Sequence, residues 1–167
     1  AGLVITPTIS ASSMVYGTSG GSLPTISHTK NPNISLTTNP TCALYLASDT
    51  GFVTPQTLGA TLAAGSYVVR CAGAAATNYT ITYGTNPSFT VTKIDITLTV
   101  GTPASTPYTG SSVSVTNSFT RTSGTLAGSD AISGMTYTYT SAGGYNSTTA
   151  PTAGGNYTIT GSSATFS

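Results

Sequence analysis

The stretch GSYVV at 65–69 returns as GNYTI at 155–159, and this repeated motif decides the fold. Both copies alternate small or polar residues with large apolar ones, a pattern typical of half-buried β-strands. The first copy is followed by another strand-like run, SFTVT at 88–92, whereas the second has no counterpart of that run before Ser167. A β-domain without its last strand exposes an unpaired edge. Since a similar run, LVIT, lies at 3–6, we expect copies to be able to join head to tail.

The composition is that of a β-rich chain with very little charge. Only 4% of the 167 residues are charged, compared with about 25% in a typical soluble domain. The chain contains 36 threonines, 23 serines and no glutamate, and its apolar residues fall in short alternating runs. No segment reaches the ~20 apolar residues needed to span a membrane, so we expect no membrane insertion. The basic residues are scattered, which excludes a nucleic-acid-binding stripe; they are Lys30, Arg70, Lys93 and Arg121.

The two cysteines, Cys42 and Cys71, both fall in strand-like runs and are separated by 29 positions. A disulfide across that loop would contribute roughly 3–4 kcal/mol in the chain-entropy model, and we predict that it forms. Two free thiols buried in a core are the alternative. A metal site would need more ligands than the lone His28 supplies. We interpret His28, which lies in a polar run, as a solvated loop residue.

Short runs with period two, separated by Gly, Pro, Ser and Asn clusters, predict an all-β chain of tandem β-sandwich domains. We divide the chain into an N-terminal strand at 1–10, a first domain at 11–93 and an incomplete second domain at 94–167. The last strand of the first domain runs almost directly into the first strand of the second. A linker this short predicts an elongated rod.

Aligning the two halves gives a position for each cysteine in the second half. The alignment places 41–45 on 135–139 and the opening of the second repeat at Tyr108. The first cysteine then corresponds to Thr136 and the second to Gly161. We therefore expect a covalent link in the first domain alone.

Three motifs in this order resemble a known family: FTVTK at 89–93, LAGSDAISGMTY at 126–137 and PTAGGNYTI at 151–159. Together with a Tyr-Gly pair near the start, they are similar to the MBG-type immunoglobulin-like repeats of large bacterial surface proteins. The resemblance covers most of the chain and implies extracellular immunoglobulin-like β-sandwiches in the tandem arrays of adhesins or surface fibres. It brings no catalytic residues. The missing closing strand of the second repeat departs from the family pattern.

The N-terminal run has two explanations. In one, the sequence is a slice of a long array taken in a shifted frame, and the run closes a preceding repeat. In the other, the chain is a natural subunit whose N-terminal strand completes the second domain of a neighbour by donor-strand complementation. For this second explanation we predict a donor strand and an acceptor region. The donor residues are Leu3, Val4, Ile5 and Thr6, and the acceptor residues are Tyr157, Ile159 and Phe166.

The remaining polar residues predict a structural protein of the cell surface and not an enzyme. The three carboxylates, Asp49, Asp95 and Asp130, lie in separate segments, so we expect no catalytic pair, no metal site and no cofactor. The alternative function is a stalk or binding module of an adhesin that recognises a glycan or a protein. Asn-x-Ser/Thr sequons are candidate N-glycosylation sites in an archaeal or eukaryotic secreted protein and chance matches in a bacterial one. They are Asn33, Asn78, Asn146 and Asn156.

Overall fold

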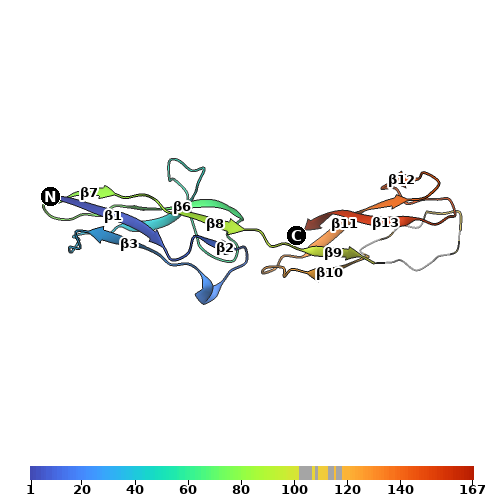
Figure 1. The fold of residues 1–167 in the computed structure, drawn as a ribbon, viewed down its shortest axis with the longest axis horizontal. Helices are drawn as coiled ribbons and strands as arrows, with labels where there is room; N and C mark the ends of the chain where they lie inside the picture. The colour runs from blue at the N-terminus through green and yellow to red at the C-terminus, as the bar shows by residue number, and fades with distance from the viewer. Residues whose placement is uncertain (102–106, 108, 113–114, 116–117) are drawn as a thin grey trace. The chain divides into compact units, whose positions relative to one another are not determined.

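A computed structural model describes residues 1–101, 107, 109–112, 115 and 118–167 (Figure 1). The described chain is all-β apart from one short 3-10 turn, and it separates into unit 1, Ala1–Ile94, and unit 2, Asp95–Ser167. In unit 1 the elements are β1 Gly2–Ile9, β2 Ser13–Val15, η1 Gly20–Ser22, β3 Ile26–Asn31, β4 Thr41–Leu46, β5 Pro55–Gln56, β6 Gly65–Ala72, β7 Thr80–Tyr83 and β8 Ser88–Thr92. In unit 2 they are β9 Thr97–Val100, β10 Phe119–Ser123, β11 Ile132–Thr140, β12 Asn146–Ser147 and β13 Thr158–Phe166.

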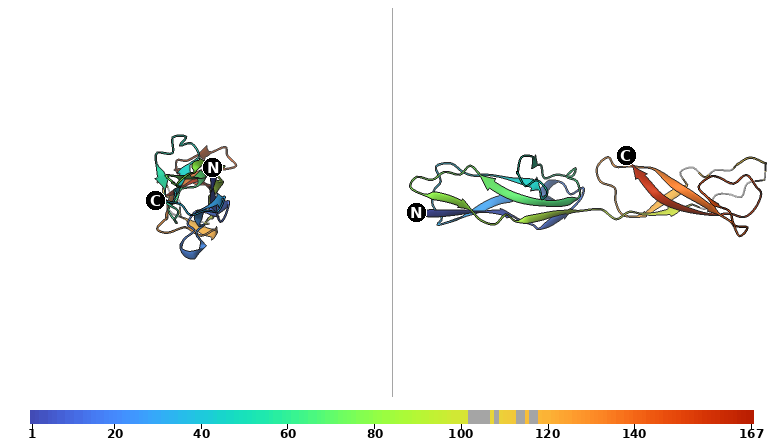
Figure 2. Two further views of the ribbon diagram at one scale, coloured as in Figure 1. Left: turned by 90° about the vertical axis from the view of Figure 1, so that its left-hand side faces the viewer. Right: turned by 90° about the horizontal axis from the view of Figure 1, so that it is seen from above.

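Unit 1 has two sheets, with strand orders β3-β1-β7 and β2-β8-β6-β4-β5. The N-terminal strand β1 lies between β3, to which it is antiparallel, and β7, to which it is parallel (Figures 1 and 2). Inward residues alternate with exposed ones along β1, β6 and β8, as the period-two pattern predicts. This arrangement agrees with the predicted β-sandwich architecture.

Two clusters of buried apolar side chains form the core of unit 1. The larger cluster contains Met14, Leu44, Leu62, Tyr67, Val69, Phe89 and Val91. The smaller cluster contains Leu3 and Ile5 of β1 with Cys71, and Cys42 and Ile81 are among the partly buried residues packed against it. The N-terminal strand therefore contributes directly to the core of its own unit.

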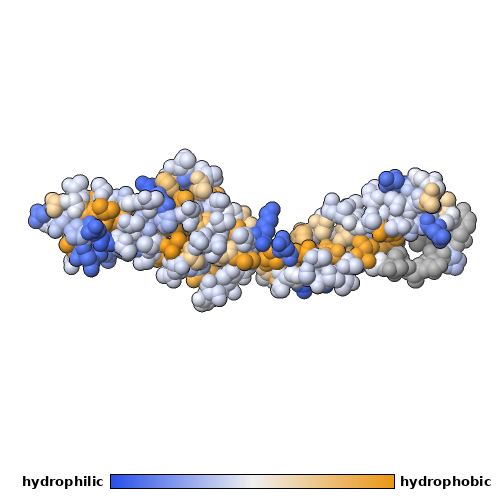
Figure 3. Space-filling view, in the orientation of Figure 1, coloured by the Kyte–Doolittle hydropathy of each residue, from blue (hydrophilic) through white to orange (hydrophobic). Residues whose placement is uncertain are grey.

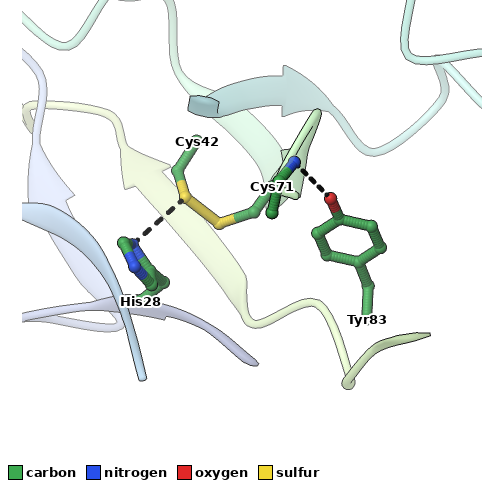
Figure 4. Close-up of a disulfide and its surroundings, with 5 residues drawn as sticks. His28, Cys42, Cys71 and Tyr83 are labelled. Carbon is green, nitrogen blue, oxygen red and sulfur yellow. Dashed lines mark hydrogen bonds between the residues drawn. A yellow bond between two sulfur atoms is a disulfide. The ribbon is translucent and has the colours of Figure 1, made fainter. Parts of the chain in front are cut away.

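The predicted disulfide between Cys42 and Cys71 is confirmed. The two residues lie opposite each other in the antiparallel pair β4–β6, with a Cα–Cα distance of 3.9 Å. His28 faces this bond: its Nδ1 atom is 4.0 Å from the Cys42 sulfur (Figure 4). Our interpretation of His28 as a solvated loop residue is wrong, because it belongs to β3 and points inward as every second residue of that strand does.

Unit 2 has a two-stranded sheet, β10-β9, and a three-stranded sheet, β12-β11-β13. Its opening strand has the same sequence pattern as that of unit 1, since ITPTI at 5–9 matches ITLTV at 96–100. Both strands pair antiparallel with the next long strand, and Ile9 lies opposite Ile26 as Val100 lies opposite Phe119. The correspondence identifies β1 as the opening strand of unit 1. Residues 1–10 belong to unit 1 in this structure.

The strand register shifts one predicted correspondence by a single residue. Cys42 lies opposite Cys71 in unit 1, and Tyr137 lies opposite Gly161 in the equivalent pair of unit 2. Tyr137, and not Thr136, therefore holds the position of Cys42. A slip of one residue exchanges the two faces of a strand, so Thr136 is on the exposed face. Tyr108, which we placed at the opening of the second repeat, lies outside the described residues.

Candidate functional site

The two copies of the repeated motif adopt the same local structure. The hydroxyl of Tyr67 donates a hydrogen bond to the carbonyl oxygen of Ala63 at 2.6 Å. The hydroxyl of Tyr157 donates in the same way to Ala153, also four residues earlier, at 3.1 Å. Each tyrosine therefore fixes the turn that leads into its own strand, and the two strands β6 and β13 can be compared residue by residue.

In unit 1 the motif pairs with the neighbouring strand β8. Tyr67 lies opposite Phe89 in the antiparallel pair β6–β8, and the amide of Val69 donates to the carbonyl oxygen of Pro87 at 3.0 Å. The side chains of Tyr67, Val69 and Phe89 are 2%, 0% and 0% exposed. Burial raises the pKa of the Tyr67 phenol, because removal from water disfavours the phenolate.

In unit 2 β13 pairs with β11, and no other described strand pairs with its second edge. Strand β6 begins at Gly65, the first residue of the motif, whereas β13 begins at Thr158, the fourth. The three preceding residues, 155–157, occupy the positions that pair with β8 in unit 1, and they are not in a strand. Strand β13 thus starts three residues later in the motif than β6 does, as expected where no described strand pairs with this segment.

The predicted acceptor residues lie at the two ends of β13: Tyr157 and Ile159 at its start and Phe166 at its end. Tyr157 and Ile159 are partly exposed, unlike their buried counterparts in unit 1. Phe166 lies at the far end of β13 and is 53% exposed. In Figure 3, apolar residues reach the surface of unit 2 in a band between its two sheets.

The interior of unit 2 also contains two tyrosine hydroxyl groups, on Tyr137 and Tyr139. Tyr137 is 8% exposed, and its buried hydroxyl has no hydrogen-bond partner in the described part of the chain. The hydroxyl of the neighbouring inward residue Tyr139 accepts a hydrogen bond from the amide of Val115 at 2.9 Å. A buried hydroxyl without a partner costs about 1–3 kcal/mol.

The predicted donor residues lie in β1 of unit 1. Leu3 and Ile5 are fully buried, Val4 is 40% exposed and Thr6 is partly exposed, so the predicted alternation of faces is present. In the single chain both edges of this strand are paired, to β3 and to β7. The strand is therefore not free, and its donation to a neighbouring chain stays a prediction.

The candidate glycosylation sites are all accessible. The four sequon asparagines are exposed; they are Asn33, Asn78, Asn146 and Asn156. Asn78 lies in a turn with a positive φ of 67°, a conformation that asparagine tolerates better than most residues. Their glycosylation stays a prediction.

The acidic residues lie in different parts of the chain. The carboxylate of Asp49 accepts hydrogen bonds from the amides of Val53 and Thr54, both at 3.0 Å, and so orders the loop after β4. Asp95 lies between β8 and β9, and Asp130 lies shortly before β11. Within the described residues, no group of three His, Cys, Asp or Glu side chains could hold a metal ion, and no helix is long and apolar enough to cross a membrane.

Sequence reasoning missed an aromatic cluster on unit 1. The Arg70 guanidinium lies 4.4 Å from the ring centroid of Phe52, and the Tyr45 ring meets Phe52 edge-on at 5.5 Å. Phe52 has a φ of 52°, which is rare for a bulky residue. Arg70 and Tyr45, both on strands, thus hold Phe52 and the loop after β4 against the sheet. A cation above an aromatic ring depends on strand register and leaves no local sequence signal.

Comparisons with protein-family models, curated proteins and solved structures find no match.

Proposed function

We propose that this chain is a structural building block of an extracellular, pilus-like filament or surface fibre, made of two immunoglobulin-like β-sandwich units. Unit 2 is completed by a β-strand of a neighbouring copy, and that strand is the N-terminal one, Leu3–Thr6. Each copy then accepts a strand in unit 2 and supplies one from unit 1. Contacts of this head-to-tail kind produce an open filament unless they close into a ring.

The observation that carries the proposal is the difference between two equivalent strands of one chain. Tyr67 and Val69 are buried on a strand that pairs with β8, whereas Tyr157 and Ile159 are partly exposed beside an edge with which no described strand pairs. We take unit 1 as the template for unit 2 with an added strand. An uncovered edge next to apolar side chains is a template for pairing with another chain.

Several features support an extracellular role. The disulfide fits an oxidising environment, where such bonds persist. The sequence has only four basic and three acidic residues, so electrostatic repulsion between copies of the chain is weak. Glycans on the exposed sequon asparagines would supply solubility that charge does not.

Negative-stain electron microscopy of the purified chain, together with an unboiled denaturing gel, tests this function. We expect thin fibres and a ladder of bands that collapses on boiling. Ile159→Asp, on the inward face of β13, should abolish both, whereas Thr160→Asp, on the exposed face of the same strand, should preserve them. Monomers alone at every concentration would contradict the proposal, and glycan binding by such monomers would favour an adhesin module.

A further inference from the structure

Resting on the proposed function, we infer that β1 of a second copy binds antiparallel to the segment 155–157 that leads into β13. In this register Leu3 lies opposite Tyr157, Val4 opposite Asn156 and Ile5 opposite Gly155. The native disulfide still joins β4 and β6 of the donating unit after β1 has left it.

The register comes from unit 1. There β8 pairs antiparallel with β6, and Phe89 and Val91 lie opposite Tyr67 and Gly65 while Thr90 lies opposite Ser66. The repeated motif places Tyr157, Gly155 and Asn156 at those three positions of unit 2. An incoming strand must therefore present two inward apolar side chains separated by one outward residue.

Strand β1 meets this requirement. Leu3 and Ile5 point inward and are fully buried in unit 1, and Val4 between them is 40% exposed. No charged residue lies within Gly2–Ile9.

The surroundings of β1 explain how unit 1 can release it. Leu3 and Ile5 are buried both before and after the exchange, so their own burial largely cancels. The cluster that they leave contains Cys71, with Cys42 packed against it, and the disulfide holds β4 and β6 together at that point. Unit 2 has Tyr137 and Gly161 in the equivalent positions and no covalent link. The link is present in the unit that would lose a strand.

Cysteine cross-linking of the full chain tests the register. Val4→Cys and Asn156→Cys place thiols on directly opposed, exposed positions, where cross-strand Cβ atoms are about 4.5–5.5 Å apart. Val4→Cys with Thr136→Cys is the matched control, because Thr136 is exposed on β11, two strands away from the incoming one. Mild oxidation is followed by a boiled, non-reducing gel and by mass mapping of the linked peptides, which also checks that Cys42–Cys71 is intact.

We expect a covalent ladder for the first pair and monomer for the control. Fibres that form without a ladder, an equal ladder in the control, or linked peptides other than those containing positions 4 and 156 would overturn the register and leave the proposed function standing. If neither fibres nor a ladder form, both the inference and the proposed function fall. Loss of fibres on reduction of wild type, with β1 still protected in the monomer, would support the role of the disulfide.

Discussion

Deletion of residues 1–10 separates the structural role of β1 from its role in assembly. Full burial of a leucine or isoleucine side chain is worth about 1.5–3 kcal/mol. Leu3 and Ile5 are both fully buried, so their loss lowers the free energy of unfolding of unit 1 by about 3–6 kcal/mol (twice the single value). The disulfide contributes about 3–4 kcal/mol, and small domains have about 5–15 kcal/mol in total. We expect the oxidised truncated chain to fold and the reduced one to unfold.

Urea unfolding followed by far-UV circular dichroism, with and without reductant, measures this effect, and electron microscopy of the same samples measures assembly. The truncated chain should form no fibres. Val4→Ala in the full-length chain is the control, because its side chain points outward and should change unfolding by less than about 1 kcal/mol. An unchanged unfolding midpoint after deletion would refute the placement of β1 in the core of unit 1. Intact fibres after deletion would show that another strand is the donor.

Three further predictions follow from the same comparison of units. Tyr67→Ala should lower the free energy of unfolding of the monomer by about 3–5 kcal/mol. Tyr157→Ala should lower it by roughly 1 kcal/mol less, because the Tyr157 ring is partly exposed. Equal losses for the two variants in urea unfolding would argue against the incompleteness of unit 2. Reduction of Cys42–Cys71 in the full-length monomer should lower the free energy of unfolding by about 3–4 kcal/mol, and no change would mean that the bond is dispensable for stability. Because burial raises the pKa of Tyr67, its contribution is complete below the ordinary tyrosine pKa of about 10 and is lost as the pH rises through the higher folded-state value; in thermal melts, Tyr67→Phe should flatten this alkaline loss.

The sequence predicts the strands of this protein better than it predicts their partners. The alternation of polar and apolar residues and the Gly-rich segments between strands locate β6 and β13. The two cysteines in strand-like runs indicate the disulfide. An opening strand and a closing strand, however, have the same alternating pattern. The run at 3–6 matches 89–92 in that respect, and only the pairing with β3 and β7 reveals that it opens unit 1.

The site depends on features with no local signature. A slip of one residue hides the correspondence of Tyr137 with Cys42, because neighbouring strand residues face opposite sides of the sheet. The inward orientation of His28 is set by the register of β3 against β1 and not by its polar neighbours. Both properties arise from pairing between distant segments. A polar run in the sequence does not by itself distinguish a loop from a strand.

Amide hydrogen exchange, resolved by residue, tests the central claim most directly. In unit 1 the amide of Val69 donates to Pro87, the residue that precedes β8. The equivalent amide in unit 2 is that of Ile159, on the open edge. We predict that in the monomer the Val69 amide exchanges slowly and the Ile159 amide rapidly, and that both exchange slowly in fibres. Slow exchange at Ile159 in the monomer, or rapid exchange there in fibres, would contradict completion of unit 2 by an added strand.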